Sequence, residues 1–110
     1  MERESGASIR HLEMISELAR GLAERGLVLY SHNYDYLAFG SWEVVVGTRK
    51  RRVRLTWDGK ESYLDGASCA LQNSHSIPQW NRLESRTLES EDPEMVLQVG
   101  TDMIVRGCAG

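Results

Sequence analysis

Cysteine and proline are scarce in this sequence, and it has only one phenylalanine and no long hydrophobic run. The two cysteines, Cys69 and Cys108, form no CxxC pair, and a disulfide framework would need more of them. A single bridge between them remains an alternative. No apolar run approaches the roughly 20 residues of a membrane span, and the charged N-terminus lacks the apolar segment of a signal peptide. We therefore expect a cytoplasmic protein.

The composition predicts one globular domain over residues 1–110. The chain is 41% hydrophobic and 26% charged, which is typical of a domain with its own core. Its formal net charge is −3 and its sequence pI is about 5.6. Both values argue against a dedicated DNA-packaging or membrane-surface protein, because such a domain is normally positive.

An amphipathic helix is predicted over residues 8–25. Apolar residues recur there at spacings of three and four, which places them on one stripe of a helix; they are Ile9, Leu12, Ile15, Leu18, Ala19, Leu22 and Ala23. His11 falls on the polar side, so we expect it at the surface. Gly26 suits the left-handed position that follows many helices.

After Gly26 the pattern indicates β-structure. We expect a short strand over 27–30, a turn over 31–35 and a long β segment over 36–46. Leu37 and Phe39 share one face of this segment, and the alternation slips by one residue at Gly40-Ser41. A β-bulge is therefore predicted there.

Two hairpins follow, and the register of the first is predicted by its side chains. With a tip at Arg49-Lys50, every pair on one face is apolar: Trp42 with Trp57, Val44 with Leu55, and Val46 with Val53. A turn at Asp58-Gly59 is the expected second tip. It would set Leu55 opposite Ser62, Val53 opposite Leu64, Arg54 opposite Tyr63, and Arg52 opposite Asp65.

The last part of the chain is less clearly patterned. Residues 66–92 form a long polar connection, rich in Ser, Asn, Gln and Glu. Residues 93–106 read either as a helix or as two strands around a turn, and the start signal Asp92-Pro93-Glu94 favours the helix. The predicted fold class is α+β: an N-terminal helix packed on an antiparallel β-meander of about four strands, with a C-terminal helix.

A basic run around the first hairpin tip is the strongest functional signal. Residues 47–61 hold six of the 13 Lys and Arg residues. The predicted register neutralises Arg52 and Arg54 in part, and this leaves Arg49, Lys50 and Arg51 at the tip as candidate phosphate contacts. A nucleic-acid-binding hairpin over 49–54 is therefore an alternative function, while a solvated hairpin with charged edges explains the same residues.

The leading hypothesis is a small cytosolic, non-catalytic interaction module. It would bind a protein partner, or a second copy of the chain, through the outer sheet face and the 66–92 connection. Candidate contact residues are Val45, Arg54, Tyr63 and Trp80. Trp80 has no periodic apolar partners, and we expect it to plug the core from the connection. The alternative is that it anchors a partner, since Trp is enriched in interface hot spots.

Enzymatic function has weaker support in the sequence. Cys69 and His75 lie six residues apart in a polar segment, which makes them the candidate site of a small enzyme. The three histidines, His11, His32 and His75, show no HxH or HxxxH spacing, so no metal site is predicted. We also expect no cofactor.

Overall fold

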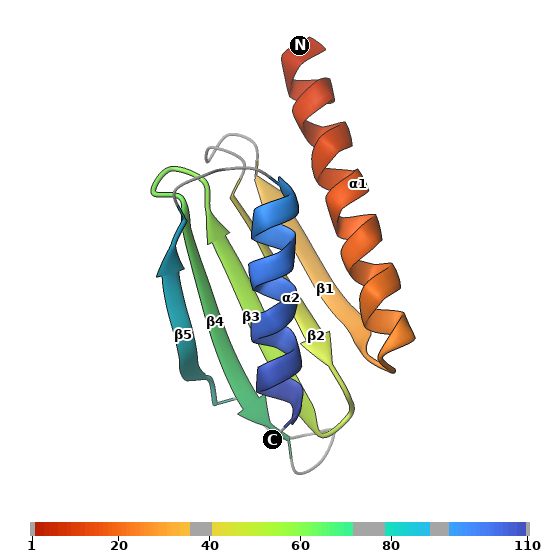
Figure 1. Cartoon of the computed structure of the whole chain (residues 1–110), viewed down its shortest axis with the longest axis vertical. Coiled ribbons are helices and arrows are strands. Elements are labelled where there is room, and N and C mark those ends of the chain that lie inside the picture. Colours follow the sequence, from red (N-terminus) through yellow and green to blue (C-terminus); the bar gives the residue numbers. More distant parts are fainter. Residues whose placement is uncertain (1, 36–40, 72–78, 89–92, 110) are drawn as a thin grey trace.

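The computed structural model describes residues 2–35, 41–71, 79–88 and 93–109. Within them, two helices lie on one side of a five-stranded antiparallel sheet (Figure 1), so the predicted α+β class is confirmed. The elements are α1 (Glu2–Glu24), β1 (Val28–Asp35), β2 (Ser41–Gly47), β3 (Arg51–Asp58), β4 (Tyr63–Ala70), β5 (Asn81–Thr87) and α2 (Pro93–Ala109). Neither of these helices is long and apolar enough to cross a membrane.

The sheet is a meander whose strands lie side by side in chain order. The predicted register of the β2–β3 hairpin is confirmed at every pair, with Trp42 opposite Trp57 and Val44 opposite Leu55. These four side chains are buried under the helices. The alternation of apolar residues alone is enough to fix this register, because a slip of one residue would turn the whole apolar set to the other face.

The second hairpin differs from the prediction, because its connection spans residues 59–62. Asp58 pairs with Tyr63, and the Asp58 side chain accepts hydrogen bonds from the backbone N–H groups of Lys60 (3.0 Å) and Glu61 (3.2 Å). This places Gly66, in place of Ser62, opposite Leu55. A polar side chain is thereby kept out of the core.

The shifted register also changes the outward pairs. Arg54 faces Ala67 where Tyr63 was expected, and Arg52 faces Cys69 where Asp65 was expected. The shift is by an even number of residues, so each side chain keeps its predicted face.

β1 occupies the residues that were predicted to form a turn. Residues 31–35 pair with β2 along their whole length, because sheet pairing overrides the local turn preference of Ser, Asn and Asp. The pairing with β2 is irregular between Leu29 and Ser31, and it leaves Tyr30 unpaired. The predicted bulge at Gly40-Ser41, together with Leu37 and Phe39, falls on or beside residues outside the described ranges.

Strands also replace part of the predicted 66–92 connection. β4 continues to Ala70, and β5 adds a fifth strand that pairs with β4 from Ser68–Asn81 to Tyr63–Thr87. Most β5 side chains are exposed, because this strand forms the edge of the sheet. A strand that buries neither face carries no alternating apolar signal, which is why the sequence did not reveal it.

The C-terminal segment is a helix, as the start signal predicted, and α2 extends to Ala109. It packs on β3 and β4, and buries Met103 and Ile104. Gly100 and Gly107 face the sheet: a Cβ added at Gly100 would lie 2.7 Å from Leu55 Cδ2. The helix therefore approaches the strands more closely than alanine would allow.

α1 begins earlier than predicted and is rotated about its axis relative to the predicted apolar stripe. Ile15, Leu18 and Leu22 are buried as expected, but Ile9 and Leu12 are 55% and 59% exposed. The helix ends as predicted at Gly26 (φ 75°), whose neighbour Leu27 donates its backbone N–H to the carbonyl of Leu22.

The rotation of α1 brings His11 into the protein, so its predicted surface position was wrong. His11 is 7% exposed, and its ring stacks on Tyr34 of β1 at a centroid distance of 4.0 Å. Its Nε2 atom lies 2.6 Å from Nε2 of His32, also on β1. This polar partner and the ring contact offset the loss of water around the imidazole.

Candidate binding surface on the outer sheet face

The outer face is the side of the sheet opposite α1 and α2, and neither helix covers it (Figure 1). Because directly opposed residues point to the same side of a sheet, the register identifies the side chains on this face. From β1 to β5 they include Tyr30, Ser31, Asn33, Glu43, Val45, Arg52, Arg54, Thr56, Tyr63, Asp65, Ala67, Cys69, Ser85 and Thr87.

Arg54 is held at the centre of the outer face by two neighbours. Its guanidinium carbon lies 4.8 Å from the ring centroid of Trp80, and its Nε lies 3.6 Å from a carboxylate oxygen of Glu43. Both charged side chains are partly exposed, so the ion pair itself adds little stability. The contacts mainly fix the direction of the guanidinium.

Arg52 makes an equivalent contact toward β1. Its guanidinium carbon lies 3.6 Å from the ring centroid of Tyr30, and its Nε–H donates to the backbone carbonyl of Thr48 at 2.9 Å. Tyr30 reaches this position because it is the residue left unpaired by the irregularity in β1. Two neighbouring arginines of β3 thus lie over aromatic rings that come from two distant segments.

A small apolar layer lies beneath these arginines. Ala67 and Cys69 point to the outer face, yet they are 4% and 2% exposed and lie outside the main core cluster. Their direct partners on β3 are Arg54 and Arg52, which are both half-buried. The arginine stems are therefore positioned to cover these small side chains, which adds packing to the contacts that hold the two cations.

Three of the four predicted contact residues come together on this surface. Val45 is half-buried and lies directly opposite Arg54, and Trp80 contacts Arg54 from the segment before β5. Trp80 therefore packs on the outer face and does not plug the core. Tyr63 shares the face but lies at the opposite end of β4, next to Asp58 and Thr87.

The predicted nucleic-acid contacts lie in or beside the β2–β3 loop. Arg49 and Lys50 are exposed there, whereas Arg51 is half-buried and begins β3. The loop is ordered by hydrogen bonds: Thr48 Oγ1 accepts the backbone N–H of Arg51 at 3.2 Å, and Leu71 donates its N–H to the carbonyl of Lys50 at 2.7 Å. The tip is thus tied to the first residue of β3 and to the residue that follows β4.

The charge on the rest of the outer face is largely paired. Asp65 accepts a hydrogen bond from Ser85 Oγ and lies 3.5 Å from Nε of Arg82. On the inner side of the same edge strand, Arg106 of α2 forms a 2.6 Å ion pair with Glu84. The basic character of the outer face is therefore concentrated near the β2–β3 hairpin.

Only one of the two residues of the predicted enzyme site lies in the part of the chain that the structure describes. Cys69 is buried, and His75 lies outside the described residues. Both cysteines are free thiols, so the alternative bridge is absent. Burial raises the pKa of the Cys108 thiol, and the nearby positive charge of Arg51 opposes this effect. Among the described residues, no three His, Cys, Asp or Glu side chains group in a way that would hold a metal ion.

The histidine pair between α1 and β1 is the strongest electrostatic feature of the inner side. Burial, and then the proximity of His32, lower the pKa of His11 to about 4. Burial also lowers the pKa of His32. Both rings are therefore neutral near pH 7, and one donates its Nε2–H to the other.

Sequence reasoning missed Tyr30 and Arg52 as a stacked pair, because the contact depends on the unpaired position in β1. It also missed His11, whose inward position follows from the partner on β1. Neither relationship leaves a local sequence signal.

Together these observations define an α+β domain with a five-stranded sheet, two helices on the inner face and an arginine–aromatic surface on the outer face. No protein family model, curated protein or solved structure matches the chain.

Proposed function

We propose that this protein is a non-catalytic interaction module, and that its outer sheet face binds a protein partner that presents acidic side chains. The observation that carries the proposal is the pair of β3 arginines held over aromatic rings on a face without helical cover. Arg52 lies over Tyr30 and Arg54 lies over Trp80. The 66–92 segment takes part through Trp80, which directly precedes β5.

The residue types favour protein recognition. Tryptophan, tyrosine and arginine dominate the binding energy of protein interfaces, because they combine apolar area with directional donors. A guanidinium already held against a ring loses less side-chain entropy on binding than a free one. Its remaining N–H groups match the two oxygens of a carboxylate.

Local charge supports an acidic partner. Although the whole chain carries a net charge of −3, the β2–β3 hairpin holds Arg49, Lys50, Arg51, Arg52 and Arg54. Glu43 is the acidic residue paired with Arg54 on this surface. An opposing acidic surface would be attracted to this end of the sheet and would orient on it.

A nucleic acid is the less favoured partner for the same surface. The Glu43 carboxylate beside Arg54 would face phosphate groups and repel them. One face of each candidate stacking ring, Tyr30 and Trp80, is already occupied by a guanidinium.

We place the protein in the cytoplasm, where its two free thiols would stay reduced.

The test is affinity capture with the full chain as bait, followed by titration of the purified captured protein. Arg54→Glu reverses the central charge of the outer face, and we expect it to weaken binding at least about tenfold. Arg86→Glu is the matched control, since Arg86 is an exposed residue of the edge strand β5. It should leave the affinity within about threefold of the wild type.

Two results would overturn the proposal. One is unchanged affinity of the captured protein for Arg54→Glu, which would place binding elsewhere on the molecule. The other is loss of all captured material on nuclease treatment, which would make nucleic acid the ligand of the basic hairpin.

A further inference from the structure

We infer that His11 of α1 and His32 of β1 form a binding site for a soft monovalent cation of the Cu(I) class, which would be held in line between their two Nε2 atoms. The site lies on the inner side of the sheet, between the first helix and the first strand (Figure 1). The inference is therefore independent of the proposed outer-face function.

The two imidazole rings point their Nε2 atoms at each other. These atoms are 2.6 Å apart, the ring centroids are 4.8 Å apart, and the ring planes differ by 19°. The centroid separation exceeds the Nε2 separation by about two ring radii, so both Nε2 atoms lie close to the line that joins the centroids. This is the donor arrangement of a linear, two-coordinate metal site.

Both Nε2 lone pairs can be offered to a cation near neutral pH. Burial, and then the proximity of His32, lower the pKa of His11 to about 4, and burial lowers the pKa of His32. Both rings are therefore neutral, and one carries its proton on Nε2. When that proton moves to Nδ1 of the same ring, both Nε2 lone pairs face the cation and no net proton is released.

The donor set determines the class of cation. Within the part of the chain that the structure describes, no third His, Cys, Asp or Glu joins the pair to make a larger metal-binding group. Zn²⁺ favours a tetrahedral set of ligands, and Ca²⁺ and Mg²⁺ favour several oxygen ligands, so two imidazoles suit these ions poorly. A monovalent cation with a filled d shell is satisfied by two nitrogen donors in line.

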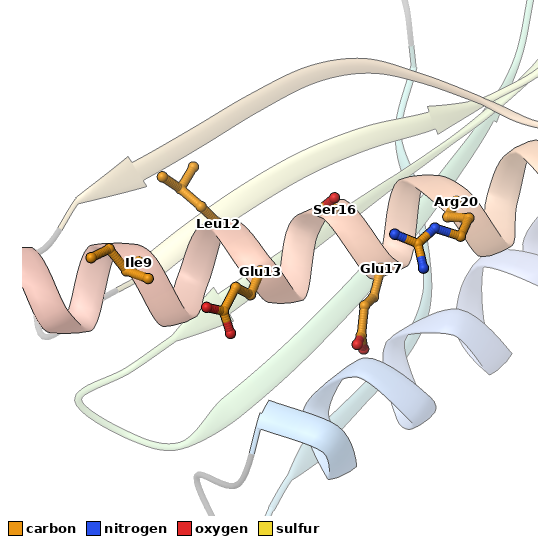
Figure 2. A pocket seen from close by; sticks show the side chains of 6 residues that line it. All are labelled: Ile9, Leu12, Glu13, Ser16, Glu17 and Arg20. Atoms are coloured by element: carbon orange, nitrogen blue, oxygen red, sulfur yellow. The ribbon is translucent and has the colours of Figure 1, made fainter.

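The surroundings of His11 are aromatic and not acidic. Figure 2 shows the exposed side of α1, where six side chains line a shallow groove of about 410 Å³; they are Ile9, Leu12, Glu13, Ser16, Glu17 and Arg20. Glu13 follows His11 by two residues, which places it about 200° around the helix axis. Tyr34 and Trp42 instead lie against the His11 ring, at centroid distances of 4.0 and 6.0 Å. Electron-rich rings favour a soft cation of single charge.

Binding requires the two rings to separate. Metal–nitrogen bonds of about 2 Å in line would set the Nε2 atoms about 4 Å apart, whereas they are 2.6 Å apart in the structure. His11 is 7% exposed and packed against Tyr34, but His32 is only half-buried. The His32 ring is therefore the one with room to move, and its solvent side gives the cation a route of entry.

The probe for the test is Ag⁺, because it shares the linear coordination of Cu(I) and is stable in air. The full chain carries Cys69→Ala and Cys108→Ala, since its free thiols would also bind a soft cation. NMR at pH 7 follows the side-chain ¹⁵N resonances of the three histidines during the titration. We expect the Nε2 resonances of His11 and His32 to shift together and to saturate at about one Ag⁺ per chain, with a dissociation constant of about 10 µM or lower.

Variants in the same background identify the ligands. His32→Asn should weaken binding at least about tenfold, and His11→Leu with His32→Leu should abolish saturable binding. His75→Ala is the matched control, because it removes the remaining histidine, and it should bind within about threefold of the parent. Circular dichroism of each variant establishes that it is folded. Cu(I), supplied without oxygen against a competing chelator, should give the same order of affinities.

The resonances of the parent protein keep the inference open to contradiction even where a variant does not fold. Equal shifts of all three histidines would show an adventitious ion only and would overturn it. So would unchanged His11 and His32 resonances in excess Ag⁺, or saturable binding that the folded double variant retains. Tighter binding of Zn²⁺ than of Ag⁺ at this pair would contradict the class of cation.

Discussion

The Nε2 atoms of His11 on α1 and His32 on β1 lie 2.6 Å apart, and this contact ties the first helix to the edge of the sheet. The two imidazole rings stack at a centroid distance of 4.8 Å, and Tyr34 lies on His11 at 4.0 Å. The contact fixes which side of α1 faces inward. It therefore also determines that Ile9 and Leu12 face solvent.

The histidine pair predicts that stability falls with acidity well above the pH range of the carboxylates. In the unfolded chain His11 titrates near 6.5, and in the folded protein its pKa is about 4, so the unfolded chain binds more protons between these values. The stabilising contribution is complete above pH 6.5 and is lost as the pH falls toward 4. The lowered pKa of His32 acts in the same direction.

Two charged rings with facing Nε2 atoms would repel each other. The ring of Tyr34 on β1 packs on His11, and the inward residues of β2 are Trp42, Val44 and Val46. On α2 the described charged residues are Glu94, Asp102 and Arg106, all exposed.

Urea unfolding at pH 8 and pH 5 measures this effect. Titration of His11 alone should lower the free energy of unfolding of the wild type by about 2 kcal/mol between these values. The double variant His11→Leu with His32→Leu should lose much less over the same interval. An equal loss in both proteins would show that other groups cause the acid sensitivity.

The glycines of the two helices predict opposite responses to alanine. A Cβ at Gly107 would lie 2.5 Å from Val53 Cγ2 and 2.6 Å from Leu83 Cδ1, so Gly107→Ala should push α2 off β3 and destabilise the protein by about 1–3 kcal/mol. Gly21 of α1 is the matched control, because the nearest atom to its added Cβ is the flexible end of Arg25 at 3.5 Å.

Gly21→Ala should stabilise the protein by about 0.5–1 kcal/mol, because alanine has the higher helix propensity. Thermal unfolding of the two variants measures both effects. The same sign for both would mean that the close approach of α2 to the sheet is not a determinant of stability.

The contact between Arg54 and Trp80 predicts energetic coupling across the outer face. Arg54→Ala and Trp80→Ala should each destabilise the protein slightly, and a double-mutant cycle should give a coupling energy of about 0.5–1 kcal/mol. Replacing Arg54 and Arg86 in a parallel cycle is the control and should be additive within about 0.3 kcal/mol. Additivity in the first cycle would mean that Trp80 does not hold the arginine in solution.

The loop tip predicts weak, salt-sensitive binding to polyanions. We expect the wild type to leave a heparin column at or below physiological ionic strength, because Arg49 and Lys50 offer few contacts and Arg51 is half-buried. Replacing all three by alanine should lower the elution salt only slightly. Retention at high salt that the triple variant abolishes would instead support a nucleic-acid-binding hairpin.

Some features of this protein follow from local sequence alone. Alternating apolar residues set the β2–β3 register, because one face of that hairpin had to be buried. Gly26 ends α1 for a local conformational reason, and the Asp92-Pro93-Glu94 signal correctly favours helix α2 over two strands. Arg54 was also recognised as an outer-face candidate, but Trp80 was placed in the 66–92 connection and its contact with Arg54 was not predicted.

Other features depend on groups far apart in the chain, and the tertiary structure decided them. Ser, Asn and Asp in β1 favour a turn locally, but pairing with β2 satisfies their backbone groups in a strand. β5 has no buried face, so its existence depends on the edge of β4. His11 is polar and was expected outside, yet His32 and Tyr34 supply a hydrogen bond and a ring that make its burial favourable. The sequence alone determined which segments bury an apolar face, whereas the polar positions needed their distant partners to be placed.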